Sequence, residues 1–271
     1  MTRPAALLFD LDGTLYVHGV PVPGAAGVLT SLRRAGVPFR FVTNTTSRPR
    51  AALVALLGGC GIEAREPEIF TPITAAVALV RREGRSRVAP FLPEASLVDL
   101  AGLELAGGVC GSPSGGTRPE VVLVGDLGER WTYTLLQEAF EYLLDGALLV
   151  ALSRDRYFKR GDRLALDAGP FVAALEYAAS RAALVAGKPS PEFFGAAVAS
   201  LGLGEGVRDV VMVGDDLWSD IRGAQQAGYQ GWLVRTGKYR ESALRESGVT
   251  PDRVLESVVD VAAELGLPAS G

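Results

Sequence analysis

The sequence predicts a doubly wound α/β fold, in which a parallel β-sheet is covered by helices, with a second α/β unit inserted into it. Two observations carry this prediction. Short apolar runs alternate with longer stretches of helical spacing, which is the pattern of parallel strands joined by helices. The alternation is regular towards both ends of the chain, whereas the middle third has a different rhythm.

The first elements lie in the N-terminal part. Residues 5–9 are short, apolar and end at Asp10, which predicts a buried strand. Residues 24–35 show helical spacing and close at a glycine, as helices often do. Residues 37–42 predict a second strand and residues 48–57 a second helix. Two neighbouring strands connected by a helix indicate a parallel sheet.

The same alternation returns near the C-terminus. Residues 209–213 predict a buried strand, residues 217–227 a helix and residues 229–234 another strand. The stretch 257–265 is amphipathic and is expected to be helical. Both ends of the chain therefore contribute strands to one core sheet.

The middle third is predicted to form a separate α/β cap. We expect the cap to span residues 76–180 and the core to consist of residues 1–75 and 181–271. The cap contains strand candidates of its own at residues 121–124 and 148–152. Its helix candidates are residues 133–144 and 171–179.

Composition limits the partners and the compartment. The 271 residues fit about two domains. The formal net charge of −4 predicts neither nucleic acid nor an anionic membrane as a partner. Cys60 and Cys110 lack metal-ligand spacing, which argues against a disulfide framework or a zinc site. Because the chain shows neither a signal-peptide pattern nor an apolar run of about 18 residues, we expect a cytoplasmic protein.

Two acids follow the first predicted strand, in the run Asp10-Leu11-Asp12-Gly13-Thr14. Ligands of doubly wound sheets bind at the carboxyl ends of the strands, where Asp10 would lie. A carboxylate there can attack phosphorus and form an aspartyl phosphate, while Asp12 can protonate the leaving oxygen and later activate water. Gly13 allows a sharp turn, and Thr14 can bond the loop. Taken alone, two acids are more often part of an ordinary loop.

Groups that suit a phosphate follow two other predicted elements. Thr43 and Asn44 come after the second strand, where a hydroxyl, an amide and backbone N–H groups can hold phosphate oxygens. Capping of the next helix is the commoner role for such residues. Lys188 precedes Pro189-Ser190-Pro191, which predicts that a helix starts just after it. Lys188 could therefore neutralise phosphoryl charge from a loop, or could be an ordinary solvated lysine.

Three acids crowd the end of the predicted strand 209–213. They are Asp215, Asp216 and Asp220, and such a cluster of repelling carboxylates indicates a hard cation with oxygen ligands. We expect Mg²⁺ as the cofactor, held by Asp10, a backbone carbonyl near Asp12, and Asp215. Capping of the following helix by Asp215 or Asp216 is the alternative, and it could hold in addition.

Together these residues resemble the four motifs of the haloacid dehalogenase superfamily, whose core sheet is Rossmann-like. The motifs are Asp10-x-Asp12-Gly-Thr, Thr43, Lys188 and Gly-Asp215-Asp216-x₃-Asp220, in that order. The insertion between Thr43 and Lys188 is similar to a C2-type cap. Residues 41–46 and 233–239 resemble the NagD-type, 4-nitrophenylphosphatase-like subclass IIA. Residues 156–160 and 169–177 resemble its branch of phospholysine phosphohistidine inorganic pyrophosphate phosphatases.

The resemblance implies a role for each matching residue. It makes Asp10 the nucleophile, Asp12 the general acid and base, and Lys188 the residue that stabilises charge. It also implies that Thr43 and Asn44 hold the phosphate and that Asp215 binds the metal. Two acids are expected to support the site: Asp220 by orienting Lys188 and water at the metal, and Asp216, which stands where this subclass often has Asn or Arg.

The predicted cap contributes three further candidates, Arg154, Tyr157 and Lys159. In enzymes with this type of cap, a cap loop closes over the core site and selects the substrate. The resemblance therefore makes these residues candidates for substrate selection, and their two cations would suit a second anionic group. A solvated basic turn is the alternative.

We therefore expect a Mg²⁺-dependent phosphatase that removes phosphate from a small phosphorylated metabolite through an aspartyl phosphate. Phosphate esters, phosphoamides and pyrophosphate all stay open as substrates. One alternative is a phosphotransferase or mutase, which would hold a phosphorylated acceptor and exclude water. Another is a module that binds a phosphate ligand without turnover. The resemblance also allows a homodimer.

Overall fold

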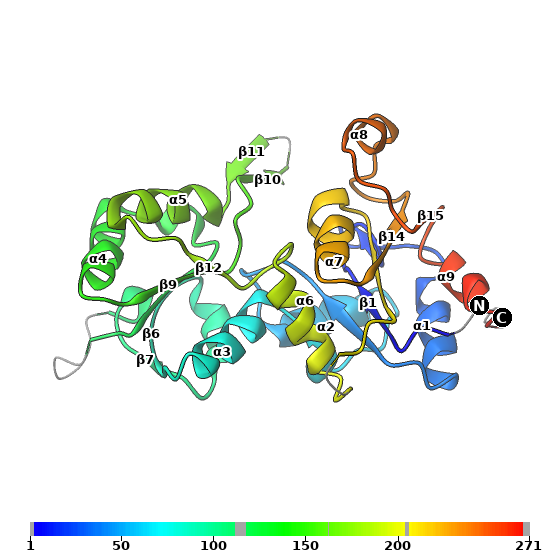
Figure 1. The fold of residues 1–271 in the computed structure, drawn as a ribbon, viewed down its shortest axis with the longest axis horizontal. Helices are drawn as coiled ribbons and strands as arrows, with labels where there is room; N and C mark the ends of the chain where they lie inside the picture. Colours follow the sequence, from blue (N-terminus) through cyan, green and yellow to red (C-terminus); the bar gives the residue numbers. More distant parts are fainter. Residues whose placement is uncertain (1–2, 112–117, 162, 204–205, 268–271) are drawn as a thin grey trace. The chain divides into compact units, whose positions relative to one another are not determined.

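The computed structural model describes residues 3–111, 118–161, 163–203 and 206–267. Its contacts divide the chain into two compact units, shown in Figure 1. Unit 1 consists of residues 1–43, 50–70 and 188–271, and unit 2 consists of residues 44–49 and 71–187. Each unit has its own sheet.

Unit 1 is built on a six-stranded parallel sheet with the order β15-β14-β13-β1-β4-β5. Its first strand lies between strands from both halves of the chain, which is the doubly wound arrangement that the sequence predicts. The strands are β1 (Ala6–Phe9), β4 (Phe39–Val42), β5 (Ile69–Phe70), β13 (Val210–Gly214), β14 (Gln230–Val234) and β15 (Arg253–Leu255).

The register of the central strands explains where the functional residues meet. Phe9 of β1 pairs with Val213 of β13 and with Phe41 of β4. Because these strands are parallel, their carboxyl ends lie at one edge of the sheet. The residues that follow them in the sequence begin at that edge.

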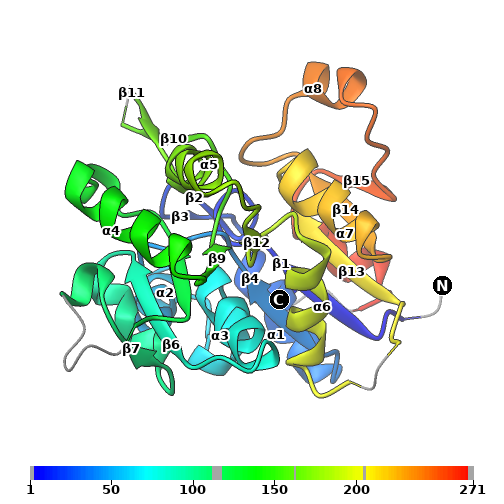
Figure 2. The ribbon, with the colours of Figure 1, turned by 60° about the vertical axis from the view of Figure 1, so that its left-hand side comes forward.

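Helices cover both faces of the unit 1 sheet. Leu7 and Phe9 face α1 (Ala25–Arg34), α2 (Arg50–Gly59) and α9 (Asp260–Glu264) in one buried cluster. On the other face lie α6 (Pro191–Ala199) and α7 (Gly223–Gln226), as Figures 1 and 2 show. The remaining elements are β2 (Tyr16–Val17), β3 (Val20–Pro21), η1 (Glu66–Glu68), the π-helical turn η6 (Leu217–Arg222) and α8 (Glu241–Glu246).

Two helix predictions for unit 1 differ from the structure. The predicted helix 217–227 begins as a π-helical turn and becomes α-helical only at Gly223. Of the predicted helix 257–265, residues 260–264 are α-helical. The apolar spacing of both stretches shows only which side chains are buried. A π-helical turn, or a short irregular segment before a helix, can bury the same side chains as an α-helix.

Unit 2 has a five-stranded parallel sheet with the order β12-β9-β8-β6-β7. The hairpin β10–β11 is separate from it. The strands are β6 (Arg87–Phe91), β7 (Glu104–Leu105), β8 (Val121–Val124), β9 (Leu148–Ala151), β10 (Tyr157–Arg160), β11 (Arg163–Leu166) and β12 (Leu184–Val185). The helices are α3 (Pro72–Arg82), α4 (Tyr133–Leu144) and α5 (Ala168–Ala179), with the short turns η2 (Glu94–Leu100), η3 (Gly108–Cys110) and η5 (Gly128–Arg130).

Helix α5 starts one turn earlier than the sequence predicts, at Ala168. Asp167 caps it, because its Oδ1 accepts the N–H of Ala168 at 2.6 Å. Pro170 is tolerated because the first helical turn lacks partners for its N–H groups anyway.

Within the described chain, Cys60 and Cys110 are both free thiols, the first buried and the second exposed. Among the described residues, no helix combines the length and apolar character needed to cross a membrane.

Candidate active site

A buried lysine joins two acids at the carboxyl edge of the unit 1 sheet. Lys188, which precedes α6, places its Nζ 2.5 Å from Asp10 Oδ1 and 2.7 Å from Asp220 Oδ1. Only 3% of the lysine is exposed, so the alternative of a solvated surface lysine does not hold. An ammonium this deeply buried needs ionic partners to offset its lost hydration.

The charge state of Lys188 follows from these partners. Burial by itself would lower its pKa, but the carboxylates of Asp10 and Asp220 outweigh burial and raise the pKa above its ordinary value. The ammonium therefore stays charged.

Asp215 and Asp220 complete a buried acidic cluster with Asp10. One carboxylate oxygen of each lies within 4.8 Å of the others. Burial, followed by the charges of Asp10 and Asp220, raises the pKa of Asp215 to about 8. Burial also raises the pKa of Asp220 to about 7, although Lys188 acts in the opposite direction.

The donor set fits a hard divalent cation. Three buried carboxylates face one ammonium, so negative charge is in excess, and the ligand atoms that converge are all carboxylate oxygens. Mg²⁺ prefers such oxygens. Asp220, expected only in a supporting role, belongs to this cluster together with Asp10 and Asp215.

Asp216 has the capping role that the sequence left open between two residues. Its Oδ1 accepts the N–H groups of Trp218 at 2.9 Å and Ser219 at 3.0 Å, at the start of η6. Its Oδ2 lies 2.9 Å from Lys238 Nζ. Burial would raise the pKa of Asp216, but Lys238 and these N–H groups outweigh burial and lower it to about 2. Asp216 is therefore an ionised helix cap.

Asp12, in the loop after β1, does not belong to the buried acidic cluster. The Asp12 side chain is exposed, and its Oδ1 accepts the backbone N–H of His18 at 3.1 Å. Gly13 has a φ of +101°, and a Cβ there would lie 2.0 Å from Asp215 Oδ2, so the position requires glycine. The expectation that Thr14 bonds the loop through its side chain is wrong, because its buried hydroxyl has no hydrogen-bond partner among the described residues.

The two predicted phosphate-binding residues fall in different units. Thr43 is buried at the end of β4 and belongs to unit 1, whereas Asn44 belongs to unit 2. Asn44 Nδ2 donates to Asp155 Oδ2 at 3.5 Å. Helix α2 begins only at Arg50, so neither residue caps it.

The cap candidates lie on unit 2. Arg154 forms an ion pair with Glu176 at 2.6 Å, and Tyr157 is 52% exposed on β10. The side chain of Lys159 lies outside the described part of the structure.

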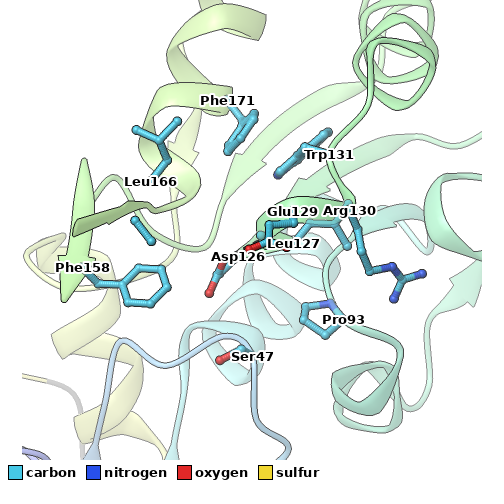
Figure 3. Close-up of a pocket in the computed structure, with 12 residues that line it drawn as sticks. Ser47, Pro93, Asp126, Leu127, Glu129, Arg130, Trp131, Phe158, Leu166 and Phe171 are labelled. Carbon is cyan, nitrogen blue, oxygen red and sulfur yellow. Dashed lines mark hydrogen bonds between the residues drawn. The ribbon is translucent and has the colours of Figure 1, made fainter. Parts of the chain in front are cut away.

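Unit 2 also contains a pocket of about 790 Å³ (Figure 3). Trp131 is stacked between Phe91 and Phe171. Its ring centroid lies 5.5 Å from that of Phe91 and 4.9 Å from that of Phe171. Trp131 and Phe171 line the pocket together with Phe158, the neighbour of Tyr157 on β10. Side chains alternate along a strand, which explains why Phe158 lines the pocket and Tyr157 does not.

Sequence reasoning missed one group of residues at the site, the turn Thr236-Gly237-Lys238 after β14. The backbone N–H of Lys238 donates to Asp215 Oδ2 at 2.6 Å, and the Thr236 hydroxyl donates to the carbonyl of Gly13. The sequence offered these residues only as part of a subclass resemblance, because a backbone N–H has no signature in residue type.

Comparisons with known proteins identify similar sequences over nearly the whole chain. Residues 7–105 match the family model of haloacid dehalogenase-like hydrolases, and residues 185–261 match a model described as HAD-hydrolase-like. Human haloacid dehalogenase-like hydrolase domain-containing protein 2 is 41% identical and covers 93% of this chain and 92% of its own. Human phospholysine phosphohistidine inorganic pyrophosphate phosphatase is 32% identical, and the match covers 94% of this chain and 91% of that protein.

Solved structures share the fold over nearly the whole chain. The p-nitrophenyl phosphatase from Archaeoglobus fulgidus matches with a TM-score of 0.85 and 26% identity, over 97% of this chain and 100% of its own. A glycerol phosphate phosphatase from Mycobacterium tuberculosis, in complex with magnesium, matches with a TM-score of 0.80 and 29% identity. The match covers 94% of this chain and 75% of that one.

Proposed function

Because the chain belongs to the haloacid dehalogenase-like hydrolases and is a phosphatase of their subclass IIA, we propose that it hydrolyses small phosphorylated metabolites with Mg²⁺ through a phosphorylated Asp10. The observation that carries the proposal is the buried bridge from Lys188 to Asp10 and Asp220, next to Asp215. We assign unit 1 to the catalytic core and unit 2 to a C2-type cap.

In the proposed first step, a carboxylate oxygen of Asp10 attacks phosphorus. The Asp10–phosphorus bond forms while the bond from phosphorus to the leaving oxygen or nitrogen breaks. Lys188 fixes the nucleophile by holding Asp10 Oδ1, and Asp12 donates a proton to the leaving group. Thr43 and Asn44 hold the phosphoryl oxygens.

In the second step, water attacks phosphorus and the bond to Asp10 breaks, which releases phosphate. Asp12 takes the proton from this water. The His18 N–H fixes Asp12 Oδ1, while Asp12 Oδ2 accepts no hydrogen bond from the described residues and is available for proton transfer.

Electrostatics must supply much of the rate enhancement. Phosphate monoester hydrolysis demands on the order of 20 kcal/mol or more, whereas one general acid contributes about 10²–10⁴-fold. Asp10, Asp215 and a backbone carbonyl near Asp12 would hold Mg²⁺, which would neutralise charge on the phosphoryl group. Lys188 adds a fixed cation that needs no reorganisation.

The pocket of unit 2 has the lining of a site for a small ligand with a ring or another apolar organic group. Its wall contains Trp131, Phe158 and Phe171, with Arg130 and Asp126 as polar neighbours (Figure 3). Pockets of this size with a few polar groups typically hold small organic ligands. The names of the relatives add phosphoamides, pyrophosphate and glycerol phosphate to the substrates worth testing.

The test is phosphate release from 4-nitrophenyl phosphate and a panel of small phosphates, with Mg²⁺ and with EDTA. Asp10→Asn should lower the Mg²⁺-dependent rate at least about a thousandfold. Asp209→Asn is the matched control, because Asp209 is exposed and precedes β13, at the opposite end of that strand from Asp215. No release from any substrate by folded, Mg²⁺-loaded protein would refute turnover. Product formation that requires an added acceptor alcohol would indicate a phosphotransferase instead.

A further inference from the structure

The 236–238 turn contacts the predicted metal site although none of its residues has a role in the proposed reaction. Thr236, Gly237 and Lys238 follow β14, which pairs with β13, the strand that leads to Asp215. The turn therefore lies beside the acids for a topological reason, since the two strands end at the same edge of the sheet.

The turn fixes one oxygen of Asp215. The N–H of Lys238 donates to Oδ2 at 2.6 Å, which is short for an N–H to oxygen bond. Asp215 Oδ1 accepts no hydrogen bond from the described residues. One carboxylate oxygen is thus held by the protein, and the other is left for a cation.

The turn also joins Asp215 to the loop that follows the nucleophile. The Thr236 hydroxyl donates to the carbonyl of Gly13. A Cβ at Gly237, where φ is +57°, would lie 2.1 Å from Asp215 Oδ2 and 2.5 Å from the Cα of Gly13. Three segments that are remote in the sequence therefore meet without room for a methyl group.

We propose that the 236–238 turn is a positioning clamp that presents Asp215 to Mg²⁺. It holds the carboxylate through the Lys238 N–H and sets its distance from the Asp10 loop through Thr236. Fixing a ligand in advance raises metal affinity, and losing a group that orients a metal ligand typically costs about 10–100-fold in affinity. The proposal rests on the proposed function, since it concerns the metal of that same site.

The backbone, and not the charge of Lys238, carries this role. The Lys238 side chain is 69% exposed where it pairs with Asp216. Exposed ion pairs contribute little, and a cation beside the site repels Mg²⁺. Loss of the ammonium should therefore change Mg²⁺ affinity less than loss of the Thr236 hydroxyl does.

The test measures the dissociation constant of Mg²⁺ by isothermal titration calorimetry on the metal-free full chain, so that turnover is not needed. Thr236→Val should weaken Mg²⁺ binding about five- to tenfold, and Thr236→Ser should restore it. Gly237→Ala should weaken binding by tenfold or more. Lys238→Met, which keeps the N–H, should lose less Mg²⁺ affinity than Thr236→Val.

Thr30→Val is the matched control. The Thr30 hydroxyl also donates to a backbone carbonyl, that of Ala26 at 3.0 Å, but it lies on α1 away from the acids. Circular dichroism and thermal melts without metal show whether each variant is folded.

The outcomes separate the clamp from the function on which it rests. If the folded wild type binds no Mg²⁺, the metal of the proposed function is refuted. If the wild type binds but folded Thr236→Val binds equally well, the clamp is refuted. A loss in Lys238→Met as large as that in Thr236→Val would also overturn the clamp, because charge and not the backbone would then be responsible.

Discussion

Replacing Lys188 by methionine tests the centre of the site most directly. The side chain is buried, and its ammonium is the only cation within hydrogen-bond distance of Asp10 and Asp220 among the described residues. Methionine keeps the length and apolar stem but leaves the carboxylates without a counter-charge. Removing one partner of a buried ion pair costs about 3–5 kcal/mol.

The expected loss of stability in Lys188→Met can be stated as a decrease in melting temperature. In a chain of this size, each kcal/mol corresponds to about 2–4 °C, so Lys188→Met should melt roughly 6–20 °C below the wild type in EDTA. Added Mg²⁺ should raise the melting temperature of the variant more than that of the wild type, because a cation can replace part of the missing charge. With Mg²⁺ present, kcat should still fall about 10²–10³-fold.

The assay combines thermal melts in EDTA and in Mg²⁺ with turnover of 4-nitrophenyl phosphate. Lys238→Met is the matched control, because its ammonium is exposed and pairs with Asp216 at 2.9 Å. It should change stability by less than about 1 kcal/mol. If Lys188→Met melts within 2–3 °C of the wild type in EDTA, which is about 1 kcal/mol, then Lys188 does not neutralise the buried acids and the reasoning fails.

Three further predictions follow from the geometry, and a fourth follows from the resemblance. Gly13→Ala should lower kcat at least about a hundredfold, because its Cβ would lie 2.0 Å from Asp215 Oδ2; turnover near the wild-type level would show that the loop can move aside. Glu120 accepts two backbone N–H groups at the start of β6, at 3.0 and 3.1 Å, which lower its pKa below the ordinary 4.5. Glu120→Gln should therefore lower the free energy of unfolding in urea by about 1 kcal/mol above pH 4.5. The difference between the wild type and the variant should shrink as pH falls through the lower pKa that Glu120 has in the folded state, and a difference that stays constant with pH would contradict this. Phe158→Ala should weaken the binding of phenol to the pocket of unit 2 about tenfold in isothermal titration calorimetry, whereas Tyr157→Ala, on the other face of β10, should leave it unchanged. A homodimer stays a prediction, and light scattering coupled to size exclusion would show a mass near 28.5 kDa if the chain is a monomer.

The local pattern of the chain was sufficient to predict the sheet and the edge that carries the chemistry. The apolar runs that end at Asp10, Thr43 and Asp215 are strands in the structure, and they are neighbours in one parallel sheet. This works because burial on both faces forces continuous apolar runs, and because parallel strands place the residues that follow them at one edge.

Only the tertiary structure showed which side chains at that edge pair with one another. Lys188 and Asp10 are 178 residues apart, and no local pattern shows that one ammonium bridges Asp10 and Asp220. Likewise, spacing did not distinguish Asp216 as the helix cap from Asp215 as the buried acid, because adjacent residues of one type differ only in the direction of their side chains.

The extent of unit 2 and the 236–238 turn also depended on the folded chain. Residues 44–49 and 71–75 belong to unit 2 by their contacts, although they continue the strand and helix rhythm of unit 1. The N–H of Lys238 reaches Asp215 only because β14 pairs beside β13. Sequence patterns record which side chains are buried, whereas a backbone hydrogen bond between remote segments leaves no mark on residue type, and so only the packed sheet reveals it.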